Sequence, residues 1–250
     1  MLTQNDLAAI RQQLVVITCA SDDDFIGAAN HILPGFQFVK LAFQLREAAE
    51  VFGFAWEQAD WYLYNGSGNG SIIYLYYQAS TMWGSISLAR DICYRPEGLV
   101  ADHAYLNLPV ELQGNGLSKY LNSLCYEQYR QAGVVKIELY ATLDAGGYVW
   151  ARAGFAATKR QEVDAIVALA YEKTIQNQTT YLTQSLCDIL KKEVSLHYGL
   201  QPDKPFPIWR WATLSFGEEL LLKTSWHGEL DLTDEVQVRI FKKYLSSEQS

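Results

Sequence analysis

The sequence is short of positive charge, and its cysteines and histidines are few and scattered. It has 20 Lys and Arg residues against 28 Asp and Glu residues, which gives a net charge of −8. This balance argues against nucleic acid or an anionic membrane surface as a partner. The four cysteines have no C-x-x-C spacing, and the four histidines are isolated in the sequence. We therefore expect free thiols and no metal site.

The sequence also contains no apolar run long enough to span a membrane, and its N-terminus has no basic segment before an apolar one. We therefore expect neither a membrane span nor a signal peptide. Cysteines without evident partners are typical of a reducing compartment. Together these features favour a cytoplasmic location.

What is present is a composition suited to a folded protein. Of the 250 residues, 49% are hydrophobic and 13% are aromatic, which is enough for a sizeable core. No repeat or linker composition divides the chain, so we predict one elaborated domain over residues 1–250. Residues 1–58 are its helical N-terminal part, residues 59–160 its core, and residues 161–250 an extension packed on that core.

Hydrophobic periodicity predicts helices and strands in a mixed order. Apolar residues recur at helical spacing near the N-terminus, and segments rich in aromatic and β-branched residues then predict several strands. The expected helices cover residues 3–18, 21–31, 37–51, 116–132, 161–174, 180–198 and 234–245. The expected strands cover residues 61–64, 71–77, 84–92, 99–108 and 134–140, with strand-like pieces at 220–232.

A glycine-containing turn joins the predicted strand at 99–108 to the predicted helix at 116–132. The turn reads Gln113-Gly114-Asn115-Gly116-Leu117-Ser118. Glycines in such a turn allow backbone N–H groups to point at a ligand, and the helix adds the positive end of its dipole. A strand, a glycine turn and a helix start together predict a phosphate site.

This order of elements and this loop resemble the GNAT superfamily of acyl-CoA N-acyltransferases. The signature of that family is Gln/Arg-x-x-Gly-x-Gly/Ala, and the loop matches it except at Ser118, a small residue in place of Gly or Ala. The family often has an aromatic residue, a short helix and Gly-Phe after the next strand, as in Trp150 to Gly154-Phe155. Residues 146–155 look like a divergent bacterial GNAT-like subgroup.

The resemblance implies a fold and a binding site for acyl-CoA. The fold is α+β, with a mostly antiparallel sheet that splays between its fourth and fifth strands and is flanked by helices. Acetyl-CoA or a longer acyl-CoA lies in that gap, with its pyrophosphate on the backbone N–H groups of residues 113–118. The backbone of Leu106, Asn107 and Leu108 then binds the pantetheine arm.

Two further residues are assigned to the cofactor by the same resemblance. Asp144 follows the fifth strand, where the family often has a polar residue that meets the cofactor arm. Its alternative role is a helix N-cap. Trp150 stacks on the pantetheine or walls the acyl pocket, and its alternative role is packing.

The residues for proton transfer fit the family pattern less well. Asp102 and His103 lie on the strand before the loop, where the family often has a carboxylate, and strand alternation turns them to opposite faces. His103 has the more suitable intrinsic pKa for a base, and Asp102 would hold the amine. The alternatives are a packing histidine and a solvated aspartate. Many members have an acid tyrosine where this chain has Trp150, so Tyr148 is the candidate acid unless the thiolate leaves unaided.

We therefore predict an N-acyltransferase that moves an acetyl or longer, fatty acyl group from acyl-CoA to a primary amine by direct attack. The acceptor is a small molecule, peptide or protein, and the acidic surface suits its positive charge. Trp226-His227 is an unusual pair that reads as a core Trp with an edge His or as part of the acceptor pocket. The alternative function is an inactive GNAT-fold protein that binds acyl-CoA or another protein. A homodimer is compatible with the sequence, which leaves the oligomeric state open.

Overall fold

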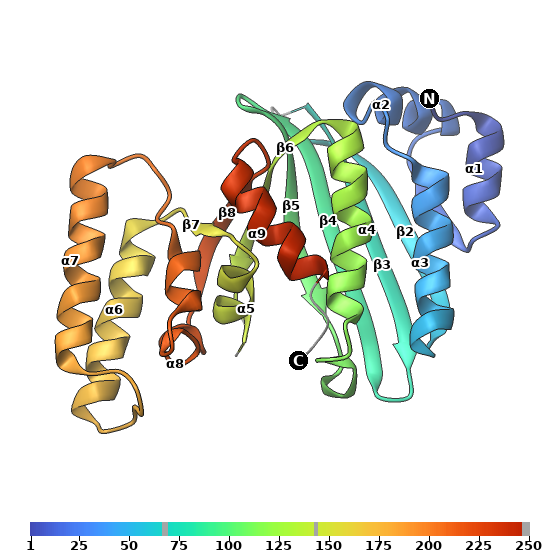
Figure 1. The fold of residues 1–250 in the computed structure, drawn as a ribbon. Coiled ribbons are helices and arrows are strands. Elements are labelled where there is room, and N and C mark those ends of the chain that lie inside the picture. The colour runs from blue at the N-terminus through green and yellow to red at the C-terminus, as the bar shows by residue number, and fades with distance from the viewer. Residues whose placement is uncertain (67–69, 143–144, 247–250) are drawn as a thin grey trace. The chain divides into compact units, whose positions relative to one another are not determined.

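The computed structural model describes residues 1–66, 70–142 and 145–246 (Figure 1). It is a mixed α+β structure with mostly antiparallel strand pairing and flanking helices, which confirms the predicted class. Contacts divide the chain into two compact units, Met1–Ile137 with Leu245–Ser250 and Glu138–Tyr244. No helix in the described part of the chain is both long and apolar enough to cross a membrane.

The first unit contains a sheet whose strands are neighbours in chain order. The strands are β1 (Val15–Thr18), β2 (Ala55–Gly66), β3 (Gly70–Thr81), β4 (Gly84–Arg95) and β5 (Gly98–Asn107). β1 is parallel to β2, and the other three pairings are antiparallel. The antiparallel strands are connected in succession, as expected for hairpins of aromatic and β-branched sequence.

Strand β1 corrects the helix that periodicity predicts over residues 3–18. Helix α1 spans only Gln4–Arg11, and Leu14 has a positive φ of 59° at the turn that follows. The next residues are β-branched, and Val15 is buried where β1 pairs with β2. The apolar residues of this segment therefore belong to a strand. Periodicity does not identify this strand, because a run of four residues is too short to show whether its period is that of a helix or a strand.

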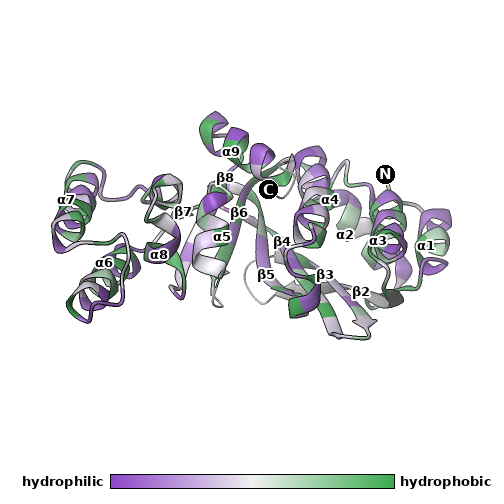
Figure 2. Ribbon diagram, turned by 60° about the horizontal axis from the view of Figure 1, so that its bottom comes forward, coloured by the Kyte–Doolittle hydropathy of each residue, from purple (hydrophilic) through white to green (hydrophobic). Residues whose placement is uncertain are grey.

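Helices α2 (Asp22–Ile32), α3 (Phe38–Phe52) and α4 (Leu117–Ala132) also belong to the first unit. The views of Figures 1 and 2 agree that α3 and α4 cover one face of the sheet. Rings of Phe38 and Trp61 meet there with centroids 5.6 Å apart. Figure 2 also shows hydrophilic and hydrophobic residues mixed along these helices, as in amphipathic helices with one buried side.

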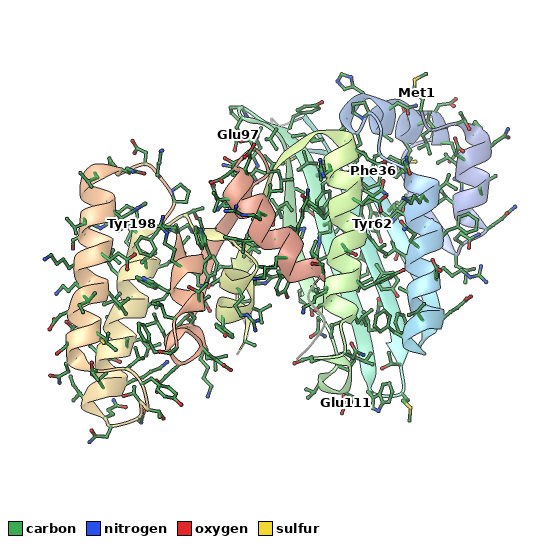
Figure 3. All side chains as sticks on the ribbon, viewed as in Figure 1. Met1, Phe36, Tyr62, Glu97, Glu111 and Tyr198 are labelled. Carbon is green, nitrogen blue, oxygen red and sulfur yellow. The ribbon has the colours of Figure 1, made fainter. Side chains whose placement is uncertain are left out.

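The alternation of side chains separates the two faces of this sheet. On β3 the residues Ile73, Leu75 and Tyr77 are buried, whereas Tyr74 and Tyr76 between them are half-buried. Tyr62 of β2, labelled in Figure 3, pairs with Tyr74 across the strands, with ring centroids 6.2 Å apart. The face away from the helices therefore carries tyrosines that retain contact with solvent.

The second unit is mainly helical. Strand β6 (Val134–Ala141) runs from the first unit into this one. The elements that follow are α5 (Gly146–Arg152), β7 (Ala156–Ala157), α6 (Arg160–Ile175), α7 (Gln184–Leu200), η2 (Ile208–Thr213), α8 (Gly217–Leu221), β8 (Trp226–Asp231) and α9 (Glu235–Ser246). β7 pairs antiparallel with β8, and α6 packs on α7. Tyr198 of α7, labelled in Figure 3, stacks on Phe206 with centroids 6.2 Å apart.

Candidate functional site

The predicted phosphate loop lies between the end of β5 and the start of α4. A short 3-10 helix, η1 (Val110–Leu112), follows β5 and contains Glu111, which is labelled in Figure 3. The side-chain amide of Gln113 donates a hydrogen bond to the carbonyl of Leu108 over 3.0 Å. This bond ties the first residue of the loop back to the end of the strand.

The two loop glycines have backbone angles that explain their presence. Gly114 has a φ of +81° and Gly116 a φ of +91°, in the left-handed region that other residues adopt at a cost. A Cβ atom built on either glycine would meet nothing within 4 Å. The glycines are therefore required by the backbone turn and not by crowding, and the space beside them is open.

The loop presents backbone donors at the start of α4. The amide of Leu117 donates to Oδ1 of Asn115 over 3.0 Å, and the amide of Tyr120 donates to the carbonyl of Gly116 over 2.9 Å. The amides of Gly114, Gly116 and Ser118 make no hydrogen bond to any described residue. Free amides at the positive end of a 16-residue helix are the arrangement that binds phosphate. Leu117 itself is fully buried, so it offers the loop only its backbone.

The strand before the loop contains a β-bulge. β4 and β5 pair Ala89 with Tyr105 and Asp91 with Asp102, so His103 and Ala104 both oppose Arg90. Further along, Leu106 and Asn107 return to regular pairing with β4. Bulges bend a strand and occur often beside active sites. This one lies between the carboxylate of Asp102 and the predicted pantetheine-binding backbone.

A fully buried arginine holds the bulge against α4. The guanidinium of Arg90 donates from Nη1 to the carbonyls of Ala89 and Tyr105, over 2.8 and 2.7 Å, and from Nη2 to Oδ1 of Asn122, over 3.0 Å. Both Arg90 and Asn122 are buried. A charge placed in a core needs such a set of acceptors. These bonds fix the position of α4, and with it the loop, relative to β5.

His103 lies on the helix-covered side of this bulge. Only 6% of the residue is exposed, and its ring lies 5.7 Å from the ring of Tyr129 on α4. Burial, together with the nearby positive charge of Arg90, holds the pKa of His103 well below its usual value. His103 is therefore a neutral imidazole inside the core, away from any solvent-borne amine.

Asp102 lies on the opposite side of the strand and faces a cavity of about 320 Å³. The cavity is lined by Ile72, Asp91, Cys93, Tyr94, Arg95, Pro96 and Asp102. Asp91 is the cross-strand partner of Asp102, and its Oδ1 atom is buried without a hydrogen-bond partner among the described residues. The cavity therefore combines two neighbouring carboxyl groups and the cationic Arg95 with apolar and aromatic walls.

The environment of Asp91 changes its acidity. Burial and the neighbouring charge of Asp102 raise the pKa of Asp91 to about 6, against a smaller opposite effect of Arg90. A carboxyl group with this pKa gains and releases protons near neutral pH, which suits a general base. Sequence reasoning missed Asp91. The signal was the pair Arg90-Asp91 inside an apolar strand, where charged residues require partners.

The remaining predicted residues lie in the second unit or outside the residues that the structure describes. Tyr148 is half-buried on α5, and the guanidinium of Arg152 lies 5.6 Å from its ring centroid. Trp150 meets Phe155 edge to face, with centroids 5.2 Å apart, which is a packing contact. Asp144 lies outside the described residues. The structure therefore brings Asp102 together with Asp91, and it places Tyr148 and Trp150 within the second unit.

Trp226 and His227, the unusual pair near the C-terminus, have different environments. Trp226 is fully buried, and its Nε1 donates to the carbonyl of Gly147 over 3.3 Å. His227 is partly exposed. No group of three or more His, Cys, Asp or Glu residues within residues 1–66, 70–142 and 145–246 has the arrangement of a metal site.

Comparison with known proteins finds no matching family model, no matching curated protein and no matching solved structure. A function for this chain is therefore inferred from its own residues.

Proposed function

We propose that the chain is an acyl-CoA-dependent N-acyltransferase, related to the GNAT superfamily, that acylates a primary amine. The observation that carries this proposal is the loop at residues 113–118. It combines two glycines of positive φ, amides without a partner among the described residues, and the start of a 16-residue helix. A pyrophosphate would accept several charge-assisted hydrogen bonds there, each worth about 1.5–3 kcal/mol.

The pantetheine arm would follow β5 from Leu108 back towards the bulge at His103 and Ala104. Residues in a strand are about 3.3 Å apart, so the four steps from Leu106 to Asp102 cover roughly 13 Å. An extended arm held by the loop would thus lead towards the Asp91–Asp102 pair. The bulge supports this proposal because it leaves β5 irregular at the point where an acyl carbonyl would need a backbone donor.

The cavity beside Asp102 supports a positively charged acceptor. An ammonium group would pair with the two carboxyl groups and lose its proton to Asp91, whose pKa of about 6 matches the task. The neutral amine would then attack the thioester carbonyl, with Asp102 holding it in position. The thiolate leaves readily because its pKa is about 8.5, so a dedicated acid is not required.

Coenzyme A binding to the purified chain tests the loop directly. Gly116→Glu adds a negative charge at the proposed pyrophosphate position, and we expect calorimetric binding of acetyl-CoA to weaken at least about 100-fold. Gly133→Glu is the matched control, because Gly133 ends the same helix with a φ of +76° and open space around it. Equal binding by both variants would refute the site.

Turnover tests the reaction and the acyl length separately. Acetyl-, octanoyl- and palmitoyl-CoA are each supplied with spermidine or a lysine peptide, and released thiol is measured. Asp91→Asn should abolish release while leaving coenzyme A binding intact. If the unmodified chain releases no thiol with any of the three donors, the proposal that it is an enzyme would be overturned.

A second candidate is a protein that binds acyl-CoA without turnover, or that binds another protein. The observation that favours it is His103, the conventional base candidate, which is buried and neutral. This candidate predicts that acyl-CoA raises the melting temperature while no thiol is released. Asp91→Asn would then change neither measurement.

A further inference from the structure

The second unit contains a histidine whose ring is oriented by a carboxylate. Glu162 lies in the first turn of α6, and its two oxygens accept from the same residue of β8. Oε2 accepts from the backbone N–H of His227 over 2.6 Å, and Oε1 lies 2.7 Å from its Nδ1. The backbone of His227 is held at its other end too, because its carbonyl accepts from the amide of Thr158 over 2.9 Å.

This geometry fixes the position of the ring proton. A carboxylate oxygen can only accept, so Nδ1 of His227 must carry a hydrogen atom. The remaining nitrogen, Nε2, then has a lone pair, and it makes no hydrogen bond to a described residue. The side chain of His227 is 41% exposed to solvent. A carboxylate that orients a histidine in one tautomer is the arrangement used for proton transfer.

The carboxylate also matches the charge that proton transfer creates. When Nε2 accepts a proton the ring becomes an imidazolium, and Glu162 supplies the opposite charge through a 2.7 Å hydrogen bond. The first turn of α6 favours a negative charge at Glu162. Lys159 lies 3.9 Å from the same carboxylate oxygen and is half exposed.

An aromatic surface lies beside the ring. Tyr140 of β6 is 52% exposed, and its ring centroid lies 4.5 Å from that of His227 at an interplanar angle of 34°. The exposed ring of Tyr140 therefore provides an apolar surface next to the imidazole of His227. A flat or aliphatic group resting on Tyr140 would hold a reacting centre near Nε2.

We propose that Glu162 and His227 form a second reaction site, in which Nε2 activates water for attack on a small ester whose apolar part rests on Tyr140. The water O–H bond breaks as its proton moves to Nε2, and a new C–O bond forms at the ester carbonyl. The ester C–O bond then breaks, and Nε2 returns the proton to the leaving alcohol. The products are an acid and an alcohol. The site does not depend on acyl-CoA.

The test uses p-nitrophenyl butyrate as a probe and follows release of p-nitrophenolate. His227→Asn is the informative variant, because its amide keeps a donor towards Glu162 but has no atom in the place of Nε2. We expect the rate to fall roughly 10- to 100-fold in His227→Asn and in Glu162→Gln. Tyr140→Ala should raise KM more than it lowers kcat. His197→Asn, at a half-buried histidine whose Nε2 lies 3.0 Å from the carbonyl oxygen of Lys204, should leave the rate unchanged.

A ¹⁵N NMR spectrum of the unmodified chain gives an independent answer if a variant does not fold. The proposal requires neutral His227 to carry its proton on Nδ1, and a proton on Nε2 would overturn it. An unchanged rate in folded His227→Asn would overturn it as well, and would leave the pair as a link between α6 and β8.

Discussion

His103 and His227 lie in two regions that give the same side chain opposite environments, one buried and one partly exposed. His103 is enclosed between β5 and α4, beside the buried charge of Arg90, and burial keeps its ring neutral. The side chain of His227 is partly exposed at the surface of its unit, and a carboxylate lies at its Nδ1. The first histidine stabilises a core, whereas the second has the geometry of a base. Proximity to a motif in the sequence is thus a weaker guide to chemistry than burial and hydrogen bonding.

The largest expected contrast is in stability. His103→Ala leaves a cavity in the core and should lower the free energy of unfolding by about 3 kcal/mol. His227→Asn keeps its contact with Glu162 and should lower it by less than about 1 kcal/mol. Urea denaturation at pH 7 measures both values. Similar losses would mean that His227 is as structural as His103.

The next effect concerns the buried charge beside His103. Asn122→Leu removes an acceptor from Arg90 and leaves part of a guanidinium without a partner, which should cost about 2.5 kcal/mol. Arg90→Met removes the charge along with its need for acceptors, so its cost should be about 1 kcal/mol. Thermal and urea unfolding compare the two variants. If Arg90→Met loses more stability than Asn122→Leu, the hydrogen bonds of the guanidinium stabilise this region in addition to the volume that the side chain fills.

A third effect depends on pH. The pKa of Asp91 is about 6 in the folded chain, above its usual value, so the stability linked to this group is complete below pH 4 and is lost as pH rises through 6. Asp91→Asn should therefore raise the free energy of unfolding at pH 7.5 by about 2 kcal/mol and change it little at pH 4.

Glu162→Gln is the counterpart of Asp91→Asn in the other region. It weakens charge-assisted hydrogen bonds to His227 and should lower stability at pH 7.5. Urea unfolding at both pH values separates the two cases. A gain in stability from Asp91→Asn that is equal at pH 4 and 7.5 would contradict the raised pKa.

The smallest expected effect is at Lys159. Its ammonium is 3.9 Å from Glu162 and the side chain is half exposed, so Lys159→Ala should change stability by less than about 0.5 kcal/mol. Hydrolysis of p-nitrophenyl butyrate should stay within roughly two-fold, because Glu162 orients His227 through its own hydrogen bonds and without help from Lys159. A larger loss of rate would make Lys159 a third member of the site.

The sequence predicts those features that depend on local pattern. Helix α4 and its end at Gly133 follow from apolar spacing and a left-handed glycine, and the loop follows from Gly114 and Gly116. Strand β4 begins at the predicted residue, Gly84. These elements are determined by residues that are neighbours in the chain, which is why periodicity finds them.

The missed features join residues that are distant in the chain. Glu162 and His227 are 65 residues apart, and Arg90 and Asn122 are 32 apart. Asp91 meets Asp102 across the β4–β5 hairpin, in the same register that pairs Arg95 with Gly98, and the bulge begins beyond this pair. No local pattern encodes the Glu162–His227 and Arg90–Asn122 pairs, because each depends on how the elements pack.

Helix α4 is bounded by a left-handed glycine at each end, Gly116 and Gly133, so its length is fixed at 16 residues. Each residue advances a helix by about 100°, so deleting one residue between Ser118 and Asn122 would change the rotational phase of everything beyond it. Asn122 would turn away from Arg90 and Tyr129 from His103, while the glycine loop kept its own sequence. The length of α4 therefore fixes the orientation of the core residues relative to the loop. We expect the chain to tolerate changes of composition in α4 far better than changes of length.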